Sequence, residues 1–341
     1  MKFTRTYFLI ALLSATLIIL QGCSLFEAEP ENNPEQIFEN FWKTFYDDYA
    51  VFEERGVDWA DQYEGFRPSV TASTTDDELF AILTQMVLPT DDGHITVTAP
   101  GRELFTANKI RRQKIDDALF NRDTIMQNYL EPGFAISEDT GYVYGKIKGE
   151  NVGYIFFRYV GENFFILNDF LDAYSEVNGY IIDLRHNDGG DFTYCYSEIG
   201  RLVDQERLAF RSKTKNGTGP DDYTEWYEWS VKPEGEYVNK PIIVLTDRYT
   251  ISAGERATMA FDVLPNVKTV GDTTNGAHGT LIGRELANGW FYTLVTQKVE
   301  LPDGKSYEGI GLAPDVYLKN TLQEINAGVD RQLEYAIEEV K

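Results

Sequence analysis

The chain has 341 residues and a mass of 38.9 kDa, with 43% hydrophobic, 14% aromatic and 25% charged residues. This composition is that of a globular protein with room for two or three domains, and it excludes a disordered or fibrous chain. The formal net charge of −24 would repel a phosphate backbone, which argues against nucleic-acid binding. The chain has only two cysteines, so a disulfide framework is not expected. It has three histidines and no Cys-x-x-Cys or His-Glu-x-x-His motif, so a metal site is not expected either.

The beginning of the chain has the pattern of a signal peptide. A positively charged start precedes an apolar run over 7–20, which is shorter than the roughly 20 residues that span a bilayer. The run ends in Leu-Gln-Gly-Cys, which resembles the lipobox of bacterial lipoproteins and implies that Cys23 is lipidated. We therefore expect residues 1–22 to be removed, Cys23 to hold the chain in a membrane, and residues 23–34 to form an acidic tether.

The alternative is an ordinary secretory signal followed by a chance cysteine. Ser24 after Cys23 favours sorting to the outer membrane by analogy with familiar lipoproteins, and it leaves open which face of the bacterial envelope carries the protein. The second cysteine, Cys195, has no histidine motif beside it and is expected to be a small buried hydrophobic residue.

Residues 35–93 predict an N-terminal helical domain. A second helix is expected to start near Thr75, where three consecutive acids favour a helix N-terminus. The first helix starts at Pro34, and its apolar residues recur three or four positions apart: Ile37, Phe38, Phe41, Trp42 and Phe45.

Residues 94–320 alternate between strands and helices and predict an α/β core. The near-continuous apolar runs over 179–184 and 241–246 are typical of central strands covered on both faces of a parallel sheet. Helices are expected after them, over 192–203 and 252–263.

Three further segments complete the prediction. Residues 212–235 are polar, Gly-rich and aromatic, and are expected to form a long surface loop over a cleft. One strand is predicted over 290–300, and one C-terminal helix over 321–341.

Four turns next to predicted strands carry candidate chemistry. In the first, which covers 183–190, a glycine pair lets the amides of Gly189 and Gly190 point at an anion or a developing oxyanion. Asp183 and Arg185 could brace this turn by a buried ion pair. A tight structural turn would also use two glycines.

The other three turns carry Ser252, His94 and Glu308. Ser252 with Glu255 three residues later fits a helix-capping box, and a serine at this place can also be a nucleophile. His94 follows Asp-Gly and is a general base or a surface turn residue. Glu308 begins the Gly/Pro-rich turn over 308–315, and its plain interpretation is a solvated carboxylate.

In this order the stretches resemble the tail-specific (C-terminal processing) serine peptidase family, in the tricorn-like branch that includes the interphotoreceptor-retinoid-binding-protein modules. The resemblance covers about residues 35–320 and rests on DGH, GYIIDLRHNDGG, TISAGE, VGDTTNGAHG and GIGLAPDV. It implies a crotonase-like (ClpP/crotonase) α/β core with an N-terminal helical domain.

The family has two catalytic arrangements, and the sequence distinguishes between them. The position of the lysine in a Ser/Lys dyad is Ala277 here, so that dyad is absent. The tricorn-like pattern fits, and by resemblance Ser252 is the nucleophile, His94 its general base and Glu308 the group that orients the imidazole.

The resemblance also implies an oxyanion hole made by the amide of Ala253 with that of Gly189 or Gly190. His186 and His278 are expected to be polar turn residues. Members that process C-terminal tails usually carry a PDZ domain, and the segment over 101–145 is too short for one. Tail-specific processing therefore does not transfer to this chain.

The sequence thus predicts a lipid-anchored serine endopeptidase that acts on a polypeptide through an acyl-enzyme, without a cofactor or metal. Two alternatives stay open. One is a non-catalytic module that binds an apolar ligand or peptide on the same scaffold. The other is an acyl-CoA enzyme of crotonase type, which would not need the Ser/His/Glu set.

Overall fold

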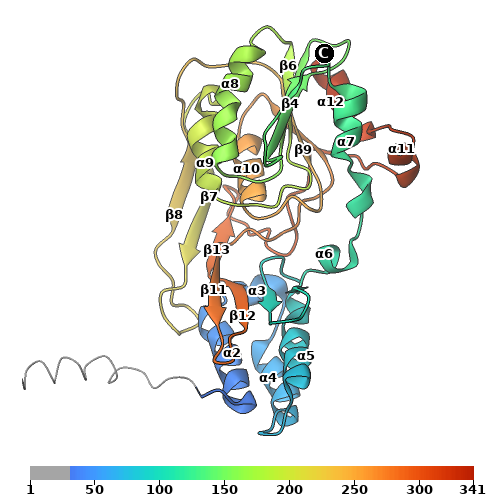
Figure 1. The fold of residues 1–341 in the computed structure, drawn as a ribbon. Coiled ribbons are helices and arrows are strands. Elements are labelled where there is room, and N and C mark those ends of the chain that lie inside the picture. Colours follow the sequence, from blue (N-terminus) through green and yellow to red (C-terminus); the bar gives the residue numbers. More distant parts are fainter. Residues whose placement is uncertain (1–30) are drawn as a thin grey trace, which may run out of the picture.

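The computed structural model describes residues 31–341, so the predicted signal peptide, Cys23 and most of the tether lie outside the described residues. The largest element is a seven-stranded sheet (Figure 1). In their order across the sheet its strands are β14 (Val316–Tyr317), β10 (Val267–Gly271), β9 (Ile242–Thr246), β6 (Gly179–Asp183), β5 (Val152–Phe157), β4 (Tyr142–Lys146) and β3 (Ala135–Ile136).

The strands from β14 to β5 are parallel, whereas β4 and β3 are antiparallel to their neighbours. Every residue of β6 and β9 is buried, which confirms the two predicted central strands. Because the parallel strands all end at the same edge, the loops after β5, β6 and β9 meet there.

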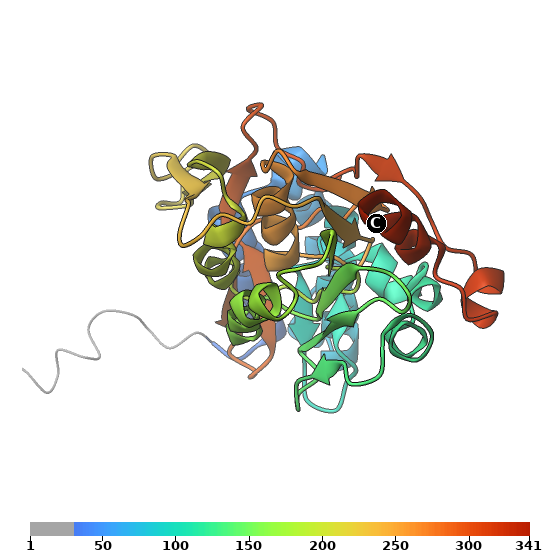
Figure 2. The ribbon, with the colours of Figure 1, turned by 90° about the horizontal axis from the view of Figure 1, so that it is seen from above.

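Helices cover both faces of the sheet (Figure 2). Tyr180 and Ile182 of β6 face one cluster of apolar residues, and Ile181 between them faces another, as the alternation of a strand requires. Buried Cys195 belongs to the first cluster, as predicted. The first face is covered by α8 (Ile166–Ala173), α9 (Phe192–Glu198) and α10 (Ala253–Asp262), and the second by α12 (Arg331–Val340).

The prediction of one helix over 321–341 is wrong. Thr321 caps the short helix α11 (Leu322–Asn326), and α12 begins only after its own cap, Asp330. Gly328 between them has φ +77°, a left-handed conformation that ends a helix.

The N-terminal helices α2 (Pro34–Asp48), α3 (Phe52–Arg55), α4 (Trp59–Phe66) and α5 (Asp76–Val87) confirm the predicted helical start, with Thr75 as the cap of α5. They share one apolar core with a second sheet, in which Val97 and Tyr292 pack near Phe41. This sheet has the order β11 (Leu281–Glu285), β12 (Phe291–Val295), β1 (Thr96–Thr98) and β2 (Phe105–Thr106).

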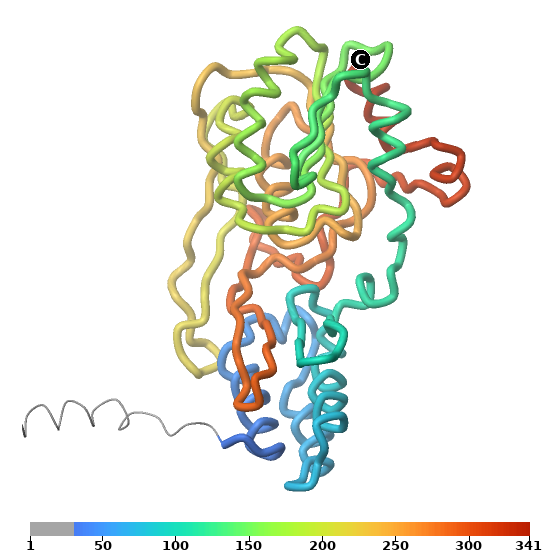
Figure 3. The backbone as a smooth tube through the Cα atoms, in the orientation of Figure 1, coloured from blue at the N-terminus to red at the C-terminus, as the bar shows by residue number. Residues whose placement is uncertain are grey.

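The predicted domain boundary between residues 93 and 94 therefore does not separate two cores. Residues 281–295 return to the N-terminal helices, and the tube in Figure 3 shows this segment beside the first helix. The N-terminal helices are completed by strands from the far end of the sequence, which the hydrophobic pattern alone cannot reveal.

The prediction of a surface loop over 212–235 is wrong in two places, because residues 212–214 end β7 and residues 227–231 form β8. A third sheet has the order β13 (Gln297–Glu300), β7 (Arg207–Thr214) and β8 (Tyr227–Val231). Aromatic packing explains the pairing, because Trp229 of β8 stacks on Phe210 of β7 with ring centroids 5.9 Å apart. The strand predicted over 290–300 is split into β12 and β13, which belong to different sheets.

A buried polar network fixes the turn after β6. Arg185 binds Asp183, 2.5 Å away, as predicted, and also binds both carboxylate oxygens of Asp330, each 2.9 Å away. Gln332 and the hydroxyl of Tyr154 complete the network. The start of α12 is thereby tied to the turn that carries the glycine pair.

Replacing Asp330 by alanine would leave the buried guanidinium of Arg185 with one carboxylate partner fewer. We expect the free energy of unfolding to fall by about 3 kcal/mol, the scale for breaking a buried ion pair. Urea denaturation followed by circular dichroism measures the loss. Glu338→Ala is the control, because this carboxylate on the same helix is 66% exposed. Equal losses in the two variants would show that the network does not stabilise the fold.

Candidate active site

Ser252 stands on the sharp turn between β9 and α10. Its backbone has φ 59° and ψ −119°, a conformation that L-residues rarely adopt and that costs on the order of 1–3 kcal/mol. The Ser252 amide donates to the carbonyl of Ala277 at 3.1 Å and to Oε2 of Glu255 at 3.2 Å. These two bonds hold the strained turn, and the serine is partly exposed between buried neighbours.

The glycine pair lies directly against this serine. Gly189 has φ +83°, and a Cβ there would lie 2.8 Å from Cβ and 3.4 Å from Oγ of Ser252. Gly190 has φ +135°, and a Cβ there would lie 2.1 Å from the carbonyl oxygen of Val160. Only glycine fits either position, for reasons of both space and conformation.

The predicted oxyanion donors are not equivalent. The amide of Gly189 donates to Oδ1 of Asn187 at 3.0 Å and is thereby occupied. Within residues 31–341 the amides of Gly190 and Ala253 have no acceptor, and Gly190 is exposed. The geometry therefore favours Gly190 and Ala253 as the pair of available N–H groups.

Glu255 is the central acceptor of the site. Its fully buried carboxylate accepts from five donors, one of which is the Ser252 amide. The other four belong to one loop: the Thr274 hydroxyl at 2.5 Å, the Gly276 amide at 2.7 Å, the Ala277 amide at 2.9 Å and Nε2 of His278 at 3.0 Å. Burial alone would raise the pKa of Glu255, but His278 and the other donors outweigh it and hold the pKa at about 2.

His278 is more than the polar turn residue that the sequence predicts. It is fully buried and forms an ion pair with Glu255. Burial disfavours its charged form, yet the carboxylates of Glu255 and Glu308 raise the pKa of His278 above its usual value. The charged imidazole thus balances a buried carboxylate beside the serine.

His94 lies in a turn that packs on the serine loop. The preceding residue, Gly93, is so close to Ile251 that a Cβ would lie 2.5 Å from its Cδ1. His94 is only 4% exposed, and neither of its ring nitrogens has a hydrogen-bond partner. Burial lowers the pKa of His94 to about 4, although Asp92 and Glu255 oppose the shift.

Glu308 does not hydrogen-bond to His94. Its Oε1 accepts from Arg55 at 2.5 Å, and its Oε2 accepts from the amides of His278 and Gly279 at 2.8 and 3.3 Å. The nearest carboxylate oxygen to the imidazole belongs to Asp92, 3.9 Å from Nδ1. The structure thus brings Glu308 into the site but not into direct contact with the predicted base.

Arg55 connects these carboxylates and is absent from the sequence-based prediction. Its guanidinium lies 3.5 Å from Asp92 and 2.5 Å from Glu308, and it also donates to the carbonyl of Gly276 at 2.6 Å. Burial would lower the pKa of Arg55, but Asp92 and Glu308 raise it. In the sequence Arg55 resembles many other helix-end cations, and only the fold brings it here.

Asn187 is a second residue of the site that the sequence does not single out. Its side-chain oxygen accepts from the Gly189 amide, and its side-chain nitrogen donates to the carbonyl of Phe157 at 2.8 Å. Its backbone carbonyl accepts from the Ile251 amide at 3.1 Å. It therefore joins the glycine turn to the serine turn. Among the described residues no group of histidine, cysteine, aspartate and glutamate side chains is arranged to hold a metal ion.

Two families of known proteins match parts of the chain. Residues 152–318 match peptidase family S41, and residues 30–87 match the tricorn protease C1 domain. The carboxy-terminal processing protease CtpA of Bacillus subtilis is 29% identical over 178 residues, which are 51% of this chain and 36% of that protein. The chain spans about a third of the length of the carboxy-terminal processing proteases that it matches.

Solved structures extend the likeness over nearly the whole chain. A candidate peptidase from Parabacteroides merdae is 27% identical, with a TM-score of 0.81, over 91% of this chain and 97% of that one. The tricorn protease is similar in fold, with 18% identity and a TM-score of 0.57 over 90% of this chain and 36% of that one. The ordered motifs, the fold and these matches agree, and the chain belongs to peptidase family S41, together with the carboxy-terminal processing serine proteases.

Proposed function

We propose that the protein is a serine peptidase that hydrolyses a polypeptide through an acyl-enzyme, with Ser252 as nucleophile and His94 as general base. The observation that carries the proposal is the strained turn of Ser252 beside the unoccupied amides of Gly190 and Ala253. A helix cap alone would need neither the strain nor two free amides.

In the proposed reaction His94 takes the hydroxyl proton while Oγ of Ser252 bonds to the peptide carbonyl carbon. The carbonyl oxygen becomes an oxyanion that accepts from the amides of Gly190 and Ala253. The carbon–nitrogen bond then breaks, and the imidazolium gives its proton to the leaving amine. A water molecule then hydrolyses the acyl-enzyme by the same steps, with His94 again as the general base.

Glu308 takes an indirect part in this proposal. Arg55 binds Glu308 and lies 3.5 Å from Asp92, whose Oδ1 accepts from the backbone amide of His94 at 2.8 Å. Glu308 therefore acts through Arg55 and Asp92 on the position of the imidazole, and is a positioning residue. Both ring nitrogens of His94 are unpartnered, which leaves one for the serine hydroxyl and one for an orienting group.

We further interpret the seven-stranded sheet and its helices as a crotonase-like core without a PDZ domain. The segment over 101–145 contains only short elements, among them α6 (Lys109–Gln113) and α7 (Arg122–Thr124), before β3 and β4. The tail-specific processing named for the relatives therefore does not extend to this chain, and the proposal is an endopeptidase.

The proposed location is the bacterial envelope, with a lipid on Cys23 and sorting to the outer membrane. The proposal rests on the lipobox-like sequence. No helix among residues 31–341 is long and apolar enough to cross a membrane.

The first test is labelling of the full-length protein with a fluorophosphonate probe. We expect wild type to be labelled and Ser252→Ala and His94→Ala to lose labelling, because the probe needs an activated serine. Ser197→Ala, which changes an exposed serine on α9, should be labelled like wild type. If His278→Ala abolishes labelling and His94→Ala does not, the assignment of the base is wrong. A folded wild type that is not labelled would favour the binding module.

The second prediction concerns the oxyanion hole. Gly190→Ala places a methyl group against the carbonyl of Val160 and displaces the amide, so we expect kcat to fall by about 10²–10³-fold. The control is Gly149→Ala, because Gly149 also has a positive φ but a Cβ there would meet nothing within 4 Å. Hydrolysis of a fluorogenic peptide measures both. An equal loss in the two variants would contradict the role of Gly190.

The third prediction follows from the pKa of His94, which burial lowers from 6.5 to about 4. A base must be neutral, so kcat/KM should stay constant as the pH falls from 8 to about 5 and decline only toward 4. His94 also protonates more readily in the unfolded chain, so its contribution to stability is complete above pH 6.5 and is lost as the pH falls through 4.

Proton NMR of the imidazole rings checks this order directly, because the chain has only three histidines. His94 should protonate last, and His186 and His278, whose pKa values are raised, should protonate first. The spectrum of His94→Gln assigns the resonance. A His94 that titrates near 6.5 would contradict the buried, neutral base.

A further inference from the structure

His186 occupies a strained position in the glycine turn, the name used here for residues 183–190. Its backbone has φ +53°, a left-handed conformation that is strained for any residue except glycine. The serine turn, residues 247–252, ends in the second strained residue, Ser252, with φ +59°. Each of the two turns of the site thus contains one strained residue. Such a conformation persists only where the surrounding groups hold it.

The carboxylate of Asp247 holds His186 in place. Its Oδ1 accepts from the backbone amide of His186 at 3.0 Å, and its Oδ2 lies 2.6 Å from Nδ1 of the same residue. The same Oδ1 also accepts from the amides of Tyr249 and Thr250, at 2.9 and 3.0 Å. One carboxylate therefore binds the backbone of both turns.

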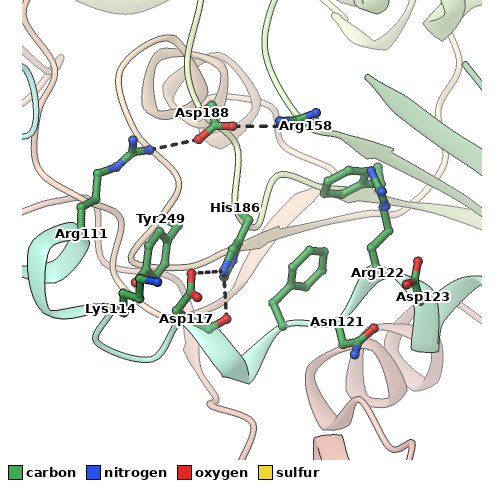
Figure 4. Close-up of a pocket in the computed structure, with 12 residues that line it drawn as sticks. Arg111, Lys114, Asp117, Asn121, Arg122, Asp123, Arg158, His186, Asp188 and Tyr249 are labelled. Atoms are coloured by element: carbon green, nitrogen blue, oxygen red, sulfur yellow. Dashed lines mark hydrogen bonds and ion pairs between the residues drawn. The ribbon is translucent and has the colours of Figure 1, made fainter. Parts of the chain in front are cut away.

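The imidazole of His186 has an acceptor at each nitrogen. Nδ1 faces Asp247, and Nε2 lies 3.2 Å from the carbonyl oxygen and 3.6 Å from Oδ1 of Asp117. Figure 4 shows these contacts with Asp117 and the ring of Tyr249, which stacks on the imidazole with centroids 4.4 Å apart. Carbonyl and carboxylate oxygens only accept, so both nitrogens must donate, which requires the charged imidazole. Burial alone would lower the pKa of His186, but Asp247 and Asp117 raise it above its usual value.

Two neutral hydrogen bonds also join the turns. The Thr250 hydroxyl and the Ile251 amide donate to backbone carbonyls of the glycine turn, at 2.8 and 3.1 Å. A hydrogen bond between charged partners is roughly twice as strong as a neutral one. Since the side chains of His186 and Asp247 are 23% and 14% exposed, water screens their attraction only in part. Their ion pair is therefore the strongest of these links, and it acts on the strained residue itself.

We propose that His186 and Asp247 are positioning residues, whose ion pair holds the glycine turn against the serine turn and thereby keeps the Gly190 amide directed at the oxyanion. The amide of Gly190 belongs to the glycine turn and that of Ala253 follows the serine turn, so the distance between the two donors depends on how the turns are joined. The effect on the reaction rests on the proposed peptidase function, whereas the effect on the turns can be measured without any reaction.

The test uses a fluorophosphonate probe on full-length wild type, His186→Gln, Asp247→Asn and the double variant. The serine oxygen bonds to phosphorus and fluoride leaves, while the phosphoryl oxygen takes the place of the oxyanion. We expect the maximal labelling rate of each single variant to fall by about 10–10²-fold, because a misplaced donor stabilises the developing charge less. The probe concentration that gives half of the maximal rate should change by less than about two-fold, since neither residue contacts the probe.

The double variant distinguishes one shared interaction from two separate effects. Each single variant removes the same ion pair, so the double variant should be labelled about as fast as either of them. The control is Asp204→Asn, which removes the partner of Arg207 from a half-buried ion pair at the start of β7 and should be labelled like wild type. If Asp247→Asn does not fold, His186→Gln is tested alone, because it changes the more exposed partner.

Amide hydrogen exchange, followed by mass spectrometry, measures the link between the turns directly. Residues 186–191 should exchange about ten-fold faster in both single variants than in wild type, because the glycine turn opens more readily without the ion pair. The exchange of the same residues in Asp204→Asn should not change.

Unchanged exchange in both single variants would overturn the proposal, whatever the labelling shows. Faster exchange with an unchanged maximal labelling rate would also overturn it, because the ion pair would then not position the oxyanion donor. A change in the half-maximal probe concentration alone would show instead that His186 contacts the probe, and would overturn it too. If folded wild type is not labelled, the peptidase is rejected, and hydrogen exchange alone decides whether the ion pair holds the turns.

Discussion

The structure of the site depends on one buried carboxylate. Glu255 accepts hydrogen bonds from the serine amide on one side and from the loop over 274–278 on the other. A buried charge without partners would cost several kcal/mol, and here five donors compensate it, one of which is the charged imidazole of His278. Because the same carboxylate holds both segments, the strained conformation of Ser252 cannot relax unless the loop also moves. Glu255, which the sequence presents as the second residue of a helix-capping box, thus fixes the geometry of the nucleophile.

A second constraint joins the beginning of the chain to its end. Arg55 comes from a short helix near the N-terminus, and its guanidinium reaches Asp92, Gly276 and Glu308. The sheet that packs on the N-terminal helices is itself built from strands at residues 96–106 and 281–295. The part that matches the tricorn C1 domain and the part that matches family S41 therefore share both a hydrophobic core and an ionic network. Arg55 of the helical part approaches Asp92, which accepts from the backbone amide of His94.

The features that the sequence predicts correctly are those that depend on short stretches of chain. The central strands, the helix caps and the Asp183–Arg185 pair are local, and each is present in the structure. Apart from the break of the C-terminal helix at Gly328, which is a local feature, the errors concern contacts between distant residues. The sequence predicts a loop where β8 lies, because the pairing of this strand depends on packing against Phe210. The sequence also predicts that Glu308 orients His94 directly, whereas in the structure Glu308 binds Arg55. The resemblance to a known family supplies the candidate catalytic residues. Which of the backbone amides beside the serine already have a hydrogen-bond acceptor depends on the fold.

The balance of charges explains how a strongly acidic protein can keep a neutral base. Near His94 and Ser252 the carboxylates of Asp92 and Glu308 are paired with Arg55, and that of Glu255 is paired with His278. Burial lowers the pKa of His94 more than the carboxylates of Asp92 and Glu255 raise it, and Arg55 and Arg256 lower it further, so the imidazole stays unprotonated. Without Arg55 and Arg256, the carboxylates of Asp92 and Glu255 would raise the pKa of His94 above its present low value. Burial, together with the nearby arginines, therefore determines the protonation state on which the proposed chemistry depends.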